Sequence, residues 1–495
     1  MDKSLILAID QGTSGSKAVI FDRNGEIISD GRAPLESLYP REGYVEQRGE
    51  DIYSSVLEAV ANSVEQAESK GFSRKDIRCC GISNQRETFI LWDKKGKPLH
   101  NAVVWQCKRS IQTCLDLKSA GHEETVRKKT GLFLDPYFSG TKAAWLKNND
   151  AATGEALRKG EAFFGTVDSW LLYCLTGGKE YKTDYSNASR TLFFNLGSLN
   201  WDSEILEIFG LGNLNLPEAL PSDSEFGSSD FNGILPQEIP ISGILGDSHA
   251  AAFGERCFEP GDAKATMGTG SSILMNTGDM VSPDDTKMVS TICWSTKNKV
   301  SYALEGIIVS CGSTLNWISS KLGFFKDGRE ADTIAMSLED NGNVYLVPAF
   351  SGLGAPWWKM EAKGEIHGLT FGTDKKHIVR AGLESISYQV TDVIKAMKKD
   401  SGTELKSLQI DGGISASPFI QDMLGTLLPL DLYRCTLKEA SALGAAFIAG
   451  LGAGIYESVE EIGNLPYNRK QILKDQNKIY EESYIKWLTI LEELS

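Results

Sequence analysis

The sequence lacks several features that would place it at once in a large class of proteins. It contains no run of about 18 apolar residues, so we expect no membrane span. Its 51 Lys and Arg are outnumbered by 66 Asp and Glu, and a net charge of −15 disfavours binding to nucleic acid or to an anionic membrane surface. The first residues lead directly into an apolar run with no basic segment before it, so no signal peptide is expected.

The cysteines also lack the spacing of common metal and redox motifs. There are nine of them, an odd number, and no CxxC pair occurs. Only Cys79 and Cys80 are adjacent. Scattered, unpaired cysteines are typical of reduced thiols, so we expect a cytoplasmic protein.

The Walker P-loop, GxxxxGK[ST] before a helix, is missing as well. The chain opens instead on an apolar run, Leu5–Ile9, which ends at Asp10 and is followed by small and hydroxyl-bearing residues. A second apolar run, Ala18–Phe21, comes next. Strand, short small-residue turn and strand together predict a β-hairpin.

The turn of this hairpin has the chemistry of a phosphate site. Its backbone N–H groups, the hydroxyls of Thr13 and Ser14, and the Lys17 cation can all bind phosphate oxygens. Asp10, at the end of the first strand, can hold a hydrated Mg²⁺.

The second part of the chain repeats the pattern. At 495 residues we expect two or more domains, and the segment Phe258–Asp262 marks a boundary that divides the chain into 1–254 and 255–495. Ala263–Met275 again reads as strand, Gly-Thr-Gly turn, strand, and a later strand enters the turn Asp411–Gly413. We predict a duplicated α/β core with a cleft between its halves.

Ten short stretches, taken together and in order, show a resemblance to a known family. They are Asp10-Gln11-Gly12-Thr13, Asn84-Gln85-Arg86-Glu87, Val104-Trp105-Gln106-Cys107, Asp135 to Lys142, Gly165-Thr166-Val167-Asp168, Asp184 to Arg190, Gly246-Asp247, Gly268-Thr269-Gly270, Pro348 to Pro356, and Asp411-Gly412-Gly413. With these, nearly the whole chain resembles the FGGY carbohydrate kinases, and within them it looks most like the glycerol kinases.

The resemblance implies a fold and an activity. It implies two ribonuclease-H-like domains, similar to those of actin and hexokinase, closing over ATP and a small polyol. The reaction would be ATP-dependent phosphorylation of a primary hydroxyl of glycerol or a closely related small polyol. The family tends to form homodimers or homotetramers.

The same resemblance assigns residues to the acceptor. It makes Asp247 the base that accepts the proton of the attacked hydroxyl; read alone, Asp247 could simply cap the helix that follows. Arg86 and Glu87 would bind the polyol hydroxyls, because a guanidinium donates to two oxygens and a carboxylate accepts from two hydroxyls. Tyr137 would add a hydroxyl contact, and Trp105 an apolar wall.

For the nucleotide, the resemblance implies a larger set of residues, drawn from both halves of the chain. The set is Thr13, Ser14, Lys17, Gly268, Thr269, Gly270, Gly312, Asn316, Gly412, Gly413 and Ser417. It also puts Mg²⁺ near Asp10 and Asp247, held largely through water.

The chain departs from the glycerol kinase pattern in the acceptor pocket. Ser248 stands where the family usually has Gln, and Ser272 where it usually has Phe. These smaller residues favour an alternative, a kinase for a larger polyol or a ketose sugar. Against the ketose branch, Asn84–Glu87 differs from the Gly-Gln-Met-His of xylulokinases.

Two nucleotide positions depart too, since Asn316 replaces a frequent Gln and Ser417 a usual Asn. A further alternative, from another class, is an actin-like ATP-binding regulator without kinase activity. An intact Arg86-Glu87 pair together with Asp247 argues against it, because a regulator needs neither.

Overall fold

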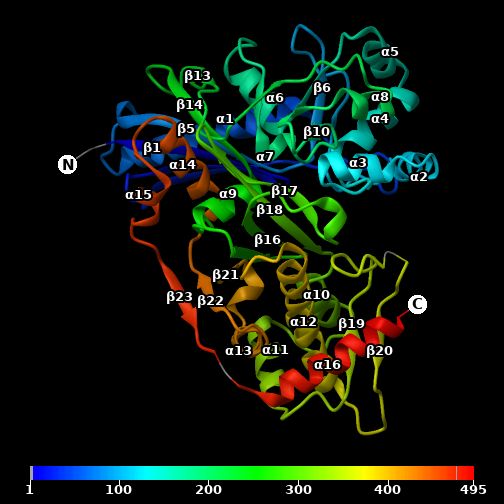
Figure 1. Cartoon of the computed structure of the whole chain (residues 1–495). Helices are drawn as coiled ribbons and strands as arrows, with labels where there is room; N and C mark the ends of the chain where they lie inside the picture. The colour runs from blue at the N-terminus through cyan, green and yellow to red at the C-terminus, as the bar shows by residue number, and fades with distance from the viewer. Residues whose placement is uncertain (1–3, 360, 475, 495) are drawn as a thin grey trace.

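Two large β-sheets organise the protein, and they lie one above the other in Figure 1. The structure is a computed structural model that describes residues 4–359, 361–474 and 476–494. The first sheet has the order β13-β14-β5-β1-β2-β3. Its strands are β1 (Leu5–Gly12), β2 (Gly15–Phe21), β3 (Ile27–Pro34), β5 (Ile77–Asn84), β13 (Gly227–Ser229) and β14 (Ile239–Gly246).

The predicted hairpin is present at the start of this sheet. β1 and β2 pair antiparallel with Asp10 opposite Lys17 and Gly12 opposite Gly15. The apolar run of β1 is buried on both faces, which explains its lack of alternation. Helix α1 (Gly49–Ser69) covers β2 and β3 with buried residues at helical spacing, among them Ile52, Val56 and Val60.

The second sheet repeats the connectivity of the first. Its order is β17-β18-β16-β15-β21-β22-β23, with bounds β15 (Asp262–Met267), β16 (Ser271–Gly278), β17 (Val289–Thr296), β18 (Lys299–Ile308), β21 (Ser407–Asp411), β22 (Asp431–Cys435) and β23 (Arg469–Ile472). In both sheets a three-stranded antiparallel unit (β1-β2-β3, β15-β16-β18) is extended by two parallel strands (β5-β14, β21-β22). The predicted duplication of an α/β core is therefore confirmed.

Each parallel pair ends in a helix, and the two helices cross. α9 (Asp247–Gly254) follows β14, and α14 (Ala440–Gly452) follows β22. A Cβ on Gly444 would lie 1.8 Å from the Ala250 carbonyl oxygen, and one on Gly254 would lie 2.3 Å from that of Ala440. Only glycine permits so close an approach at this crossing. α14 also packs on β1, β5 and β14 (orange beside blue in Figure 1), so the second half completes the core of the first.

Further elements flank the two large sheets. Between β5 and β14 the chain forms the helices α2 to α8 and three strands of a small sheet, β6 (Phe89–Trp92), β7 (Ala102–Val103) and β8 (Phe163–Thr166). The fourth strand of this sheet, β4 (Glu46–Gln47), precedes α1. In the second half, α10 (Gly312–Ser320), α12 (Lys375–Ser401) and α13 (Pro418–Leu427) cover the sheet. The polar segment 183–190, which reads as a turn in the sequence, is a strand end and the short helix α7 (Tyr185–Ala188).

Within the described residues, no helix is both long enough and apolar enough to cross a membrane. All nine cysteines are free thiols, and eight of them are buried.

Candidate active site

Three neighbouring strands of the first sheet bring their ends together at one edge. β1 and β14 both run parallel to β5, with Asp10 opposite Ser83 and Gly246 opposite Asn84. The residues that follow these strand ends therefore meet. The Ser83 hydroxyl donates to Asp10 Oδ1 at 3.0 Å.

Arg86 and Asp247 are in direct contact at this edge. Arg86 Nε lies 3.2 Å from Asp247 Oδ1, and the Ser248 N–H donates to the same oxygen at 2.6 Å. Arg86 is buried, whereas the Asp247 side chain is 42 % exposed. Asp247 is the first residue of α9 and Gly246 is its N-cap. The structure thus leaves this carboxylate accessible to solvent.

Glu87 has an unusual backbone and a charged partner. Its φ of 61° is in the left-handed region, which a residue with a side chain rarely adopts outside functional sites. Arg190 Nε donates to Glu87 Oε1 at 2.6 Å. Burial raises the pKa of Glu87, and the neighbouring Arg190 and Arg86 oppose this.

Glu305, on β18, lies opposite these arginines. Arg86 donates to it from Nη2 at 2.7 Å and from Nη1 at 3.1 Å, and Arg190 Nη1 lies 2.7 Å from Glu305 Oε2. Burial opposes ionisation of Glu305, but Arg190 and Arg86 hold its pKa well below the usual range. Arg86, Arg190, Glu87 and Glu305 form a buried cluster with two charges of each sign, which we call the charge square.

The two serines that depart from the family pattern extend this network. Ser272 donates to Glu305 Oε1 at 2.7 Å, and the Ser248 and Ser272 hydroxyls lie 3.1 Å apart. His249, the residue after Ser248, is fully buried. Burial, followed by the charge of Arg86, lowers its pKa well below the usual value, so it is neutral.

Trp105 links the acceptor side to the phosphate hairpin. Its indole N–H donates to the Thr13 hydroxyl at 2.9 Å, and its ring is 5.5 Å from that of Tyr137. Burial, followed by the charge of Glu87, raises the pKa of Tyr137, so it keeps its hydroxyl proton. Tyr137 therefore lies next to the charge square and Trp105 next to Tyr137, and both aromatic residues are only half-buried.

Three of the residues predicted to bind the nucleotide or Mg²⁺ line a cavity. A cavity of about 390 Å³ is bounded by Asp10 and Lys17 from the first hairpin and by Gly412 from the second half. Lys17 Nζ lies 2.8 Å from the Glu439 carboxylate, which also pairs with Arg32 at 2.8 Å. The first hairpin and the turn that contains Gly412 thus line one cavity, whereas the Gly268-Thr269-Gly270 turn is not part of its lining.

The Gly-Thr-Gly turn of the second hairpin is tied to α10. The N–H groups of Gly312 and Ser313 donate to the carbonyls of Gly268 and Thr269 at 2.9 and 3.0 Å. A Cβ on Gly312 would approach the Gly268 oxygen to 2.7 Å, so this contact needs glycine. Thr269 itself is exposed, and Gly270 closes the turn.

The other residues predicted to bind the nucleotide lie on turns and helices, and several of them are exposed. Gly412 has a φ of 82°, and a Cβ placed on it would lie 2.5 Å from the Met267 carbonyl oxygen. Gly413, Asn316 and Ser14 are exposed. Ser417 caps α13, accepting from the Ile420 N–H at 3.2 Å, and also hydrogen-bonds Asp332.

Asp10 and Asp247 are the carboxylates available for a metal ion. Burial, opposed by Lys17 and reinforced by Asp247, raises the pKa of Asp10 to about 6. No group of three or more His, Cys, Asp or Glu with metal-binding geometry occurs among the described residues. Two carboxylates fit Mg²⁺, which usually keeps several of its waters.

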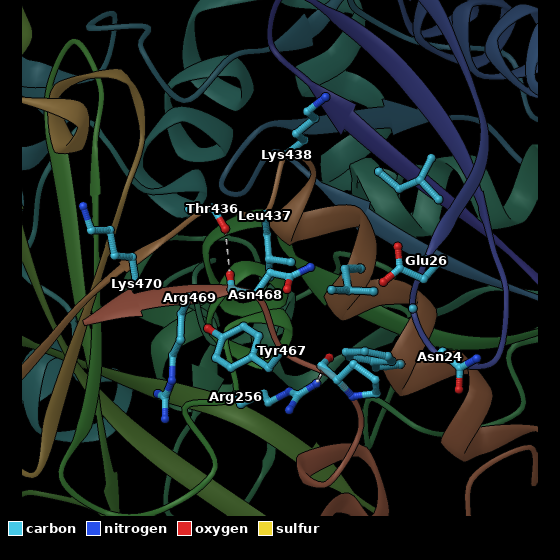
Figure 2. A pocket seen from close by; sticks show the side chains of 15 residues that line it. Asn24, Glu26, Arg256, Thr436, Leu437, Lys438, Tyr467, Asn468, Arg469 and Lys470 are labelled. Carbon is cyan, nitrogen blue, oxygen red and sulfur yellow. Dashed lines mark hydrogen bonds between the residues drawn. The ribbon is translucent and has the colours of Figure 1, made fainter. Parts of the chain in front are cut away.

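Another cavity, of about 490 Å³, lies away from this chemistry. Figure 2 shows its lining, which includes Arg256, Tyr467 and Asn468, and contains none of the predicted site residues. The Arg256 guanidinium is bound to the carbonyls of Gly463, Leu465 and Pro466. Thr436 to Lys438 line both cavities.

Three residues of the site were missed in the sequence. Arg190 ends a polar segment that suggested only a turn, and Glu439 precedes an Ala-rich helix. Glu305 had the clearest signal, because it is a carboxylate within an apolar strand, Tyr302–Ile308. A buried charge in a strand requires a partner.

The structure is a duplicated α/β fold in which the charge square lies at the strand ends of the first sheet and Asp10, at the same edge, lines a cavity of about 390 Å³. The FGGY family of carbohydrate kinases matches with its N-terminal domain over residues 5–254 and its C-terminal domain over residues 263–453. The chain belongs to this family of carbohydrate kinases.

Within the family, several glycerol kinases are similar to this chain. The glycerol kinase of Caldanaerobacter subterraneus subsp. tengcongensis is 45% identical over 92% of this chain and 91% of its own. Glycerol kinase 2 of Thermotoga maritima is 43% identical over 97% of both chains. The crystal structure of Plasmodium falciparum glycerol kinase with ADP superposes with a TM-score of 0.89 at 32% identity, covering 99% of this chain and 98% of that one.

Proposed function

We propose that this protein transfers the terminal phosphoryl group of ATP to a primary hydroxyl of glycerol or a closely related small polyol. The observation that carries the proposal is the half-exposed Asp247 carboxylate, which contacts Arg86 at the strand ends beside Asp10. The glycerol kinases among the relatives support the same choice of acceptor.

Asp247 acts as the base in this proposal. Oδ1 already contacts the Ser248 N–H and Arg86 Nε, so Oδ2 accepts the hydroxyl proton as the new P–O bond forms. Arg86 donates to polyol oxygens and Glu87 accepts from polyol hydroxyls. Trp105 and Tyr137 exclude water from the carbon chain and orient it.

The nucleotide side positions the phosphates. Lys17, the Thr13 hydroxyl and the backbone around Gly268 and Gly412 would bind phosphate oxygens. Asp10 and Asp247 would hold Mg²⁺, which when bound neutralises charge on the transferred group. Gly312, Asn316, Ser417 and Gly413 would border the nucleoside, and Ser14, Thr269 and Gly270 the phosphates.

The test is ADP release by the purified protein with Mg-ATP and a panel of acceptors. The panel contains glycerol, erythritol, threitol, the pentitols, dihydroxyacetone and the common ketoses. The highest kcat/KM with glycerol is the expected result. No ADP release with any acceptor, together with intact ATP binding, would contradict a kinase and favour the regulator.

The Ser248–Ser272 contact favours a second candidate, a kinase for a longer polyol. Two hydroxyls 3.1 Å apart offer a polar wall where the family has larger side chains. A longer polyol that exceeds glycerol tenfold in kcat/KM, or about 1.4 kcal/mol of transition-state binding, would support it.

Three broader expectations belong to the same proposal. The chain divides into functional domains at 1–254 and 255–495, the protein forms a homodimer or homotetramer, and it works in the cytoplasm. Free thiols throughout are in keeping with a reducing compartment. Light scattering at working concentration measures the oligomeric state.

A further inference from the structure

We infer that Glu305 is a positioning residue for the acceptor, acting through Arg86, with Arg190 as its second anchor. The inference rests on the proposed function, since it assumes that Arg86 binds the polyol. Glu305 comes from β18 of the second sheet, whereas both arginines come from the first half of the chain. The acceptor pocket is therefore assembled across the two halves.

Contacts at all three of its nitrogens hold the Arg86 guanidinium in place. Nε faces Asp247 at 3.2 Å, while Nη1 and Nη2 donate to the two oxygens of Glu305 at 3.1 and 2.7 Å. A guanidinium carries five N–H groups in one plane. Three are directed by these contacts, and two remain for polyol oxygens in a plane that Glu305 sets.

Glu305 itself is held from a second side. Arg190 Nη1 lies 2.7 Å from Glu305 Oε2, and Arg190 Nε donates to Glu87. Arg190 is fully buried, with its guanidinium 5.2 Å from the centre of the Phe138 ring. Arg190 thus fixes both carboxylates relative to each other, although it does not itself contact Asp247 in the described contacts.

Because its charges balance, replacing any one residue of the charge square leaves an unpaired charge in a buried site. Two arginines and two glutamates balance in a buried site, and the loss of one carboxylate leaves a buried cation without its partner. A purely structural role predicts only lower stability. A positioning role predicts an effect on glycerol that requires Arg86.

A double-mutant cycle separates these roles, with glycerol as the probe and kcat/KM, KM for glycerol, KM for ATP and Tm as readouts. We expect Glu305→Gln to lower kcat/KM for glycerol about 30-fold, mainly through KM, because a hydrogen bond to a charged group is lost. KM for ATP should stay within about twofold. In the Arg86→Met background, Glu305→Gln should cost less than about threefold, because the residue through which it acts is gone.

The control is a buried pair of the same chemistry far from the acceptor. Arg380 Nε donates to Glu384 at 2.8 Å, and both side chains are 2 % exposed. Glu384→Gln should lower Tm as Glu305→Gln does, with no change in KM for glycerol.

Two results would overturn the inference. One is an equal cost of Glu305→Gln with and without Arg86; the other is a Glu305→Gln enzyme that loses Tm but keeps its KM for glycerol, as Glu384→Gln should. A different result would contradict the proposed function itself. An Arg86→Met enzyme whose KM for glycerol is unchanged would show that Arg86 does not bind the acceptor.

Discussion

The two halves of the protein share one strand order but place different chemistry at equivalent positions. After β5 the first half has Arg86 and Glu87, whereas after β21 the second half has Gly412 and Gly413. After β14 comes Asp247, and after β22 comes a loop ending at Glu439. In the proposed function, the first half supplies the charged side chains of the acceptor site, whereas the second half contributes backbone at its glycine turns to the phosphate site, beside Lys17 of the first hairpin.

This difference follows from what each ligand needs. A polyol has only hydroxyl groups, so fixed charges are required to orient it and to remove a proton. A phosphate chain already carries charge and is bound well by backbone N–H groups, which glycine turns leave unobstructed. The comparison predicts that side-chain changes matter most in the first half, and backbone changes most where glycines make close contacts.

The largest effect is expected at the base. Asp247→Asn should lower kcat about 10³-fold, since it keeps the shape of the side chain but cannot accept the proton. ATP binding, measured by calorimetry, should persist. A kcat within tenfold of the wild type would show that another group takes the proton.

The second largest effect is expected at the crossing of α9 and α14, where a glycine of each helix approaches the backbone of the other helix. Gly444→Ala and Gly254→Ala should each lower the free energy of unfolding by about 2 kcal/mol, because the new Cβ meets a carbonyl oxygen at 1.8 or 2.3 Å. Denaturant titration measures the loss. Gly328→Ala is the matched control, since no atom lies within 4 Å of its Cβ, and it should be neutral.

The Mg²⁺ dependence of the activity should report the ionisation of Asp10, the carboxylate of the first hairpin. The pKa of Asp10 is about 6, and only the ionised form binds a cation. As pH falls below 6, the concentration of Mg²⁺ for half-maximal activity should rise about tenfold per pH unit; above pH 7 it should be constant. An Asp10→Asn enzyme should lose this dependence, and an unchanged profile would remove Asp10 from the metal site.

The smallest effect concerns Glu439, which forms an ion pair with Lys17 at the wall of the cavity. Glu439→Gln should lower KM for ATP about threefold, because phosphate oxygens then meet less competition for the Lys17 cation. Glu461→Gln, which breaks the Arg23 pair at 2.9 Å, is the control and should leave KM for ATP unchanged. A rise in KM for ATP on Glu439→Gln would mean that Glu439 positions Lys17 instead of competing for it.

The sequence predicted the parts of the fold and site that are local. The hairpin with Asp10 and Lys17 and the glycine turns are each encoded within a few residues. The charge square was not predictable in this way, because its partners are 103 and 219 residues apart in the chain. Nothing in a local pattern indicates which buried charge will meet which.

Ser417 shows the opposite difficulty. Its family position suggests the nucleotide, yet the structure shows it capping α13 with Pro418 in the first turn. Ser followed by Pro is itself a local helix-start signal, and it competes with the functional interpretation. Residues with a sufficient structural role need a second observation before a ligand is assigned to them.

The crossing of α9 and α14 has a consequence for biosynthesis. Ile6, Ala8 and Leu245 of the first sheet are covered by Ala445, Ile448 and their neighbours in α14. A ribosome must therefore release residues 440–452 before the first sheet can bury that face. Until then the nascent chain exposes an apolar surface, the kind that chaperones recognise and that promotes aggregation. The strands of the first sheet are all synthesised by residue 246, but the sheet can bury this face only after α14 has left the ribosome.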